Sequence, residues 1–278
     1  MAEKQQGEMT FLEHLEELRW HLIRSVLAIT VFGVLAFVYK RIVFDIILMG
    51  PSQSDFWTNR MLCELGQLVN VQKLCINATT LRLQNVVVTG QFLAHVKISI
   101  IAGLVLAFPY ITWEFWRFIR PALFDKEISY AKGSVFYITL LFILGVCFGY
   151  YLISPLSINF LYNYKVSDIV ENIPTLNSYV GLVAAIVLAS GVLFELPVLV
   201  YFLSKIGLVT PEFLKSYRRH ALVVILLLSG IITPPDIFSQ IMVSIPLLVL
   251  YEISIVISRR VVKQREQEMT QEITPKEE

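Results

Sequence analysis

The sequence predicts an all-α polytopic membrane protein with six transmembrane helices, the last two of them short. Composition is the first observation: 56% of the 278 residues are hydrophobic and only 16% are charged, with a mean hydropathy of +0.66. A soluble protein of this length could not bury that much apolar surface. The second observation is that the apolar residues form blocks free of Asp, Glu, Lys and Arg. Crossing about 30 Å of hydrocarbon takes about 20 helical residues, which the blocks approach or exceed.

The predicted spans in chain order are about 22–39, 96–116, 134–153, 178–203, 218–232 and 238–257. The segment before the first span is rich in glutamate, whereas a cleaved signal peptide begins with basic residues, so we expect this span to be retained. The last two spans are separated by Pro234, Pro235 and Asp236. Proline breaks the helical hydrogen-bond ladder, so these three residues predict a structural turn, with Asp236 capping the sixth helix. A re-entrant hairpin is the alternative.

The distribution of basic residues is the third observation. With six spans, most of the 23 Lys and Arg residues fall on the side that holds both termini. The positive-inside rule then predicts that both termini are cytoplasmic. We expect residues 1–260 to form a single membrane domain, with a first external loop over 40–95 and a disordered cytoplasmic tail over 261–278.

The first external loop is long enough to hold structure of its own. Leu62, Leu65 and Leu68 recur at helical spacing after Asn59, which predicts a short amphipathic helix capped by Asn59. Cys63 and Cys75 lie in the same loop. On an oxidising face they could pair, but their spacing alone decides neither a disulfide nor two free thiols.

Motifs typical of catalysis and cofactor binding are absent from the sequence. It contains no CxxC, HExxH, GxSxG or phosphate-binding Gly-rich loop. We therefore expect no enzymatic activity, no metal site and no cofactor. The net charge of +1 gives no reason to expect nucleic acid as a partner.

Glu195 is a carboxylate within the fourth apolar block, in the stretch LFELPV. A charged group at the centre of a bilayer costs roughly 3 kcal/mol on insertion scales and usually faces a polar cavity or a partner. The alternative is a hydrogen bond that fixes packing with a neighbouring helix. We favour a functional role because Pro197, which has no backbone N–H, frees a backbone carbonyl one turn upstream.

Two acidic segments flank the predicted cytoplasmic ends of the first two spans. Residues 11–19 place leucines on one face of an amphipathic helix with Glu17 and other glutamates around it. Residues 113–127 combine carboxylates with aromatic rings, the groups that guanidinium side chains bind by paired hydrogen bonds and stacking. A solvated turn with an interfacial aromatic belt is the alternative.

Four segments together resemble one known family: FLEHLEELRWHL, FIRPALFDKE, GVLFELPV and TPPDIFSQ. In order and spacing they are similar to TatC, the multispanning receptor subunit of the twin-arginine protein translocase. The resemblance extends from Phe11 to about Arg260. It implies a protein of the bacterial cytoplasmic (inner) membrane that binds twin-arginine signal peptides and exports folded proteins, driven by the proton-motive force.

The resemblance also implies functional residues and partners. The signal-peptide site would comprise Glu17, Arg19, Leu22, Phe118 and Glu127. Glu195 would be the polar intramembrane residue, and Thr233 and Gln240 would dock partner helices. The implied partners are single-span TatA/TatB-type subunits, signal peptides of folded cargo, further copies of the chain in a receptor complex, and membrane lipid.

Two other function classes remain as alternatives. A secondary transporter of a small solute or ion would also have polar intramembrane residues and a broken helix pair. The sequence shows no repeat between its halves and only one carboxylate deep in a span, which argues against it. A membrane enzyme is disfavoured because no nucleophile–base or metal-ligand pair lies at membrane depth.

Overall fold

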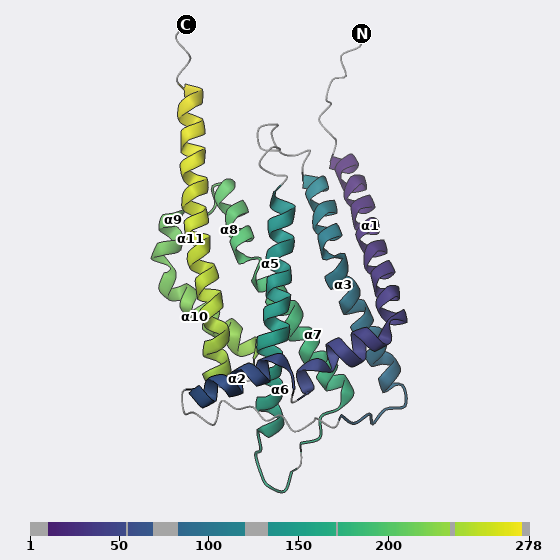
Figure 1. Ribbon diagram of the computed structural model, residues 1–278. Helices are drawn as coiled ribbons and strands as arrows, with labels where there is room; N and C mark the ends of the chain where they lie inside the picture. Colours follow the sequence, from purple (N-terminus) through teal and green to yellow (C-terminus); the bar gives the residue numbers. More distant parts are fainter. Residues whose placement is uncertain are drawn as a thin grey trace. The chain divides into compact units, whose positions relative to one another are not determined.

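The computed structural model describes residues 11–53, 55–68, 83–119, 133–170, 172–233 and 237–273. The chain forms two compact units, one of Met1–Asp45 with Phe92–Leu140 and one of Ile46–Gln91 with Leu141–Glu278. The helices, shown in Figure 1, are α1 (Phe11–Val38), α2 (Trp57–Leu68), α3 (Gly90–Ile119), α5 (Ser134–Phe148), α6 (Ser154–Asn163), α7 (Leu176–Leu193), α8 (Leu196–Lys205), α9 (Pro211–Ser216), α10 (Arg218–Ile232) and α11 (Ile237–Ile273). Short π- and 3₁₀-helical segments are η1 (Arg41–Leu48), η2 (Gly50–Ser52) and η5 (Gly149–Ile153).

Within the described ranges, five helical stretches are long and apolar enough to cross a membrane: Leu15–Val38, Gly90–Ile119, Ser134–Asn163, Leu176–Lys205 and Gln240–Gln267. α10 has the bounds predicted for the fifth span, but its 15 residues make it shorter than these. The predicted all-α membrane fold is therefore confirmed. The fourth stretch is a broken helix, since α7 ends at Leu193 and α8 begins at Leu196.

The last helix differs from the prediction because it is long. α11 runs for 37 residues through Pro246 to Ile273. The prediction of a disordered tail is therefore wrong for residues 261–273. The tail is rich in Arg, Lys, Gln and Glu, which are good helix formers, and extending an existing helix avoids the cost of nucleation. The predicted turn at Pro234, Pro235 and Asp236 lies outside the described residues.

The predicted helix of the first loop exists, but its start differs. α2 begins at Trp57, so Asn59 lies inside the helix instead of capping it, and its side-chain amide donates to the carbonyl of Gln53 at 3.0 Å. The hydroxyl of Thr58 donates to the carbonyl of Tyr151, which fastens α2 to η5. The loop helix is thus held by buried polar contacts as well as by its apolar face.

In the unit that contains α1 and α3, the two helices cross at glycine. A Cβ atom on Gly103 would lie 2.6 Å from the backbone nitrogen of Gly33 and 2.7 Å from its Cα. Nearer the other end of the pair, the rings of Phe37 and His95 stack with their centroids 4.0 Å apart. Small residues allow such close backbone approach, which is the usual way that helices associate in lipid. The crossing at Gly103 therefore sets the register between the helices.

This crossing gives a prediction with a matched control. Gly103→Ala should destabilise the protein by about 1–3 kcal/mol, because its methyl group meets backbone that cannot rotate away. Gly33→Ala should be neutral or stabilising by up to about 1 kcal/mol, because its nearest neighbour is the Ser99 carbonyl at 3.5 Å and alanine favours helix. Thermal unfolding of the purified variants in detergent measures both effects. Equal stability of the two variants would contradict the close crossing.

The second unit is built on two further close helix contacts. Gly145 and Gly149 pack against Ser190 and Gly191 of α7, so that a Cβ on Gly145 would lie 2.5 Å from the Ser190 carbonyl. α8 packs on α11, and Figure 1 shows the two side by side. A buried cluster joins η5, α7, α10 and α11, made of Ile153, Ile186, Ile225, Val243, Leu247 and Leu250.

The end of α8 needs a glycine. Gly207 has a φ of 82°, the left-handed conformation that L side chains rarely adopt. The backbone nitrogen of Gly207 donates to Ser204 and that of Leu208 to Leu203, which is the Schellman pattern of hydrogen bonds at a helix end. This turn redirects the chain into α9, which Thr210 caps by accepting from the backbone N–H of Phe213.

Candidate functional site

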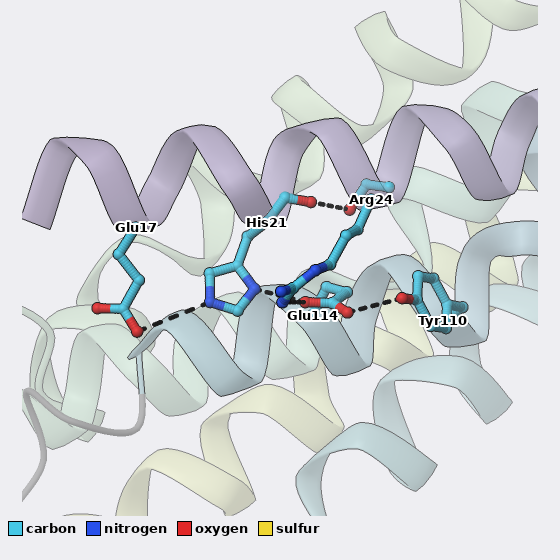
Figure 2. Close-up of polar contacts among 6 residues, drawn as sticks. Glu17, His21, Arg24, Tyr110 and Glu114 are labelled. Carbon is cyan, nitrogen blue, oxygen red and sulfur yellow. Dashed lines mark hydrogen bonds and ion pairs between the residues drawn. The ribbon is translucent and has the colours of Figure 1, made fainter.

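The candidate signal-peptide site begins on one face of α1. Glu17, His21 and Arg24 are spaced four and three residues apart, so the helical period places them on the same side. Figure 2 shows all three side chains pointing toward α3, where Tyr110 and Glu114 lie one turn apart. Both helices belong to the same compact unit.

Glu114 is the centre of this polar cluster and is only 1% exposed. One carboxylate oxygen, Oε1, accepts a hydrogen bond of 2.7 Å from the hydroxyl of Tyr110. The other, Oε2, is in close contact with Nδ1 of His21 and lies 3.9 Å from Nη1 of Arg24. Burying a carboxylate is costly unless donors surround it, and here donors from both helices do so. Glu114 is therefore fully engaged within the protein.

His21 links Glu114 to Glu17. The His21 ring is buried, and its Nε2 lies 3.9 Å from Oε1 of Glu17. The second oxygen of Glu17, Oε2, is buried and has no hydrogen-bond partner among the described residues. Phe118 approaches the His21 ring edge-on, with centroids 6.0 Å apart and an interplanar angle of 64°. The structure thus gathers Glu17 and Phe118 around His21.

The other predicted members of the site are placed differently. Arg19 and Leu22 are exposed, Leu22 at 62%, and a helix turns about 100° per residue, so they lie on another face of α1 from Glu17. Glu127 lies outside the described residues. In the acidic and aromatic segment that begins at Trp113, Glu114 is buried and already lies beside the guanidinium group of Arg24, so it is not free to bind an arginine of a peptide.

Sequence reasoning missed the pairing of His21 with Glu114. Two signals pointed to it. A glutamate at position 114 adjoins an apolar block, and His21 shares the helical face of Glu17 and Arg24. What the sequence lacks is the register between α1 and α3, because the paired residues are 93 positions apart.

Glu195 lies at the break between α7 and α8, at the N-cap of α8, where its side chain makes no capping hydrogen bond. Both carboxyl oxygens are buried, and neither has a hydrogen-bond partner within the described part of the chain. Pro197 follows in the first turn of α8 and cannot donate to the carbonyl of Leu193. An unpaired buried carboxyl group is energetically costly, which is typical of a functional position.

Thr233 and Gln240 belong to a polar cluster between α10 and α11. Thr233 is 3% exposed and donates to the carbonyl of Ser229 at 2.8 Å. Gln240 is half-buried, and its amide nitrogen donates to the carbonyl of Leu226 at 2.9 Å. These donors already have partners within the helix pair.

The predicted cysteine pair falls partly outside the structure. Cys63 is half-buried on α2 and takes part in a disulfide, whereas Cys75 lies outside the described residues. The pairing of these two cysteines stays a proposal. Cys147 is a free, exposed thiol on α5.

Comparison with known proteins agrees with the fold. The family model of the Sec-independent protein translocase protein (TatC) matches residues 13–246, which is most of the chain. The chain belongs to the TatC family. It is therefore a multi-pass membrane protein, and the members of its family are protein translocase components. The alternative, a secondary transporter of a small solute or ion, is not favoured.

Relatives in the TatC family match nearly the whole chain. The Sec-independent protein translocase protein TatC of Blattabacterium sp. subsp. Periplaneta americana is 43% identical over 263 residues, covering 94% of this chain and 99% of that protein. TatCy of Bacillus subtilis is 31% identical and covers 93% of this chain and 92% of its own length. A crystal structure of the twin-arginine translocase receptor TatC aligns with a TM-score of 0.65 at 33% identity, over 88% of this chain and 98% of that one.

Proposed function

We propose that this protein is the receptor of a twin-arginine translocation system. It binds signal peptides that carry paired arginines and, with single-span partner subunits, exports folded proteins using the proton-motive force. The observation that carries the proposal is the Glu17 carboxylate, which has one oxygen facing His21 and a second, buried oxygen without a hydrogen-bond partner among the described residues.

A guanidinium group fits this carboxylate. An ionised carboxylate accepts two parallel N–H bonds from arginine, and such charge-assisted pairs are about twice as strong as neutral hydrogen bonds. A buried acceptor left unpaired costs free energy that a bound donor would recover. Phe118 adds an aromatic ring beside the site, suited to guanidinium stacking. We place Glu127 in the same site as the carboxylate for the second arginine, and Arg19 and Leu22 on the adjoining surface of α1.

The partner subunits would dock elsewhere. Glu195 provides a polar group within an apolar stretch that has no hydrogen-bond partner among the described residues, and we assign to it the binding of a polar side chain of a single-span helix. We assign Thr233 and Gln240 to a second docking region on α10 and α11, and we expect several copies of the chain in the receptor complex. Neither role requires catalysis, so we assign no enzymatic activity.

We further propose that the protein lies in the bacterial cytoplasmic membrane with both termini in the cytoplasm. The distribution of Lys and Arg supports this orientation. It places the Glu17 end of α1 on the side where signal peptides are synthesised.

Peptide affinities test the proposed function. Purified protein in detergent is titrated with a fluorescent signal peptide bearing two arginines and with matched peptides bearing two lysines or two glutamines. Loss of a charge-assisted pair costs about 1.5–3 kcal/mol, so we expect the glutamine peptide to bind about ten- to hundredfold more weakly. The lysine peptide should lie between the two. Equal affinity for all three peptides would contradict the proposal.

A further inference from the structure

We propose that His21 and Glu114 are positioning residues that fix the Glu17 carboxylate in an orientation selective for guanidinium over ammonium groups. The inference rests on the proposed function and deepens it, because it concerns how the same site discriminates between two cations. Neither residue needs to touch the peptide. Their role is to hold the group that does.

The first step is that Glu114 is fixed from its own helix and from α1. The Tyr110 hydroxyl, one turn away on α3, holds Oε1 at 2.7 Å, and Arg24 of α1 lies 3.9 Å from Oε2. With 1% of its surface exposed, Glu114 has little room for another rotamer. It is a rigid acceptor at the helix interface.

The second step is that this acceptor orients the imidazole. A carboxylate can only accept, so Nδ1 of His21 donates to Glu114. As an imidazolium the ring carries a second N–H at Nε2, which is turned toward Oε1 of Glu17 at 3.9 Å, as Figure 2 shows, and attracts that carboxylate by its charge. The edge of Phe118 packs against the same ring and opposes its rotation. His21 therefore presents a fixed nitrogen to a glutamate that is itself only half-buried.

Guanidinium and ammonium groups make different demands on a carboxylate. A guanidinium fork needs both carboxylate oxygens in a defined plane, whereas an ammonium group is a point charge that tolerates many carboxylate orientations. If Glu17 were free to rotate, the arginine peptide would lose its paired geometry, while the lysine peptide would lose little. The cluster therefore predicts a loss of selectivity, more than a loss of charge attraction, when His21 is removed.

The test is the ratio of lysine-peptide to arginine-peptide dissociation constants in variants of the full-length protein. His21→Ala and Glu114→Ala should lower this ratio at least about fivefold, which corresponds to about 1 kcal/mol. Glu114→Gln should retain most of it, because an amide carbonyl still accepts from His21 and a tyrosine hydroxyl can accept from the amide. Tyr110→Phe is a milder change that keeps the ring, and it should give an intermediate ratio. It provides the test if the alanine variants fail to fold.

His95→Ala is the matched control. It removes a histidine from the same helix pair, where the ring stacks on Phe37 and Nε2 is buried without a partner in the described structure. The ratio in this variant should be that of the unmodified protein. If the ratio does not change in His21→Ala, including the case in which the arginine and lysine peptides lose affinity equally, the positioning role of His21 is wrong but the proposed function stands. Absence of discrimination in the unmodified protein would contradict the proposed function as well.

Discussion

Substituting Glu17 by glutamine should weaken binding of the twin-arginine peptide about ten- to hundredfold. The variant keeps the size and shape of the side chain but removes its charge and one of its two acceptor oxygens. The buried oxygen Oε2 has no hydrogen-bond partner among the described residues, so no described residue pairs with Glu17 in place of the peptide arginine. A hydrogen bond to a charged group contributes about 1.5–3 kcal/mol, which sets the expected range.

Glu16→Gln is the control for this measurement. Glu16 is the neighbouring residue on α1, carries the same formal charge, and is exposed. Its removal changes the general electrostatic attraction by the same amount, and that attraction is screened by salt. At physiological ionic strength we expect the affinity of the Glu16→Gln variant for the twin-arginine peptide to change less than about twofold. Similar losses in both variants would show that charge, and not the placement of Glu17, determines binding.

Substituting Glu195 by leucine should abolish most transport while making the protein more stable. The carboxyl group is buried without a hydrogen-bond partner in the described residues, so its removal should stabilise the fold by about 1–3 kcal/mol. The same change removes the polar group proposed to bind a partner helix, a contact of about 1–2 kcal/mol in lipid, so transport should fall about five- to thirtyfold. Opposite effects on stability and activity are typical of functional groups kept at an energetic cost.

Three readouts on the leucine variant separate the alternatives. Thermal unfolding measures stability, export of a folded reporter measures transport, and the peptide titration measures signal-peptide binding, which should be unchanged. Glu195→Gln should retain part of the transport activity because an amide can still hydrogen-bond. A leucine variant that is less stable than the parent would contradict the account, because it would mean that Glu195 serves packing.

Hydropathy predicted the membrane fold because the free energy of transfer into lipid is nearly a sum over residues. It gave the bounds of α10 and located the other spans, although helices such as α1 extend well beyond their apolar blocks. The length of α11 was missed because hydropathy does not report helix propensity outside the membrane, where polar residues continue the helix to Ile273.

The candidate site was predictable only in part. Glu17 and Phe118 follow from residue type and from the resemblance to the TatC family. The roles of His21 and Glu114 depend on contact between residues 93 positions apart. That contact is determined by the close crossing of α1 and α3 at Gly103, a property of the packed helices that no pattern along the chain reveals. Helical spacing alone separates Arg19 and Leu22 from Glu17, but it does not tell which of these two faces of α1 meets α3.

The most direct test of the central claim is to map where the paired arginines of a bound signal peptide lie. A photoreactive residue placed beside the arginine pair is activated in the complex, and the crosslinked residues are identified by mass spectrometry. We predict crosslinks to α1 around Glu17 and His21 and to the end of α3 at Phe118, with loss of these crosslinks in Glu17→Gln. Crosslinks confined to α10 and α11, or a pattern unchanged when the arginines are replaced by glutamines, would contradict the claim that Glu17 binds the arginine pair.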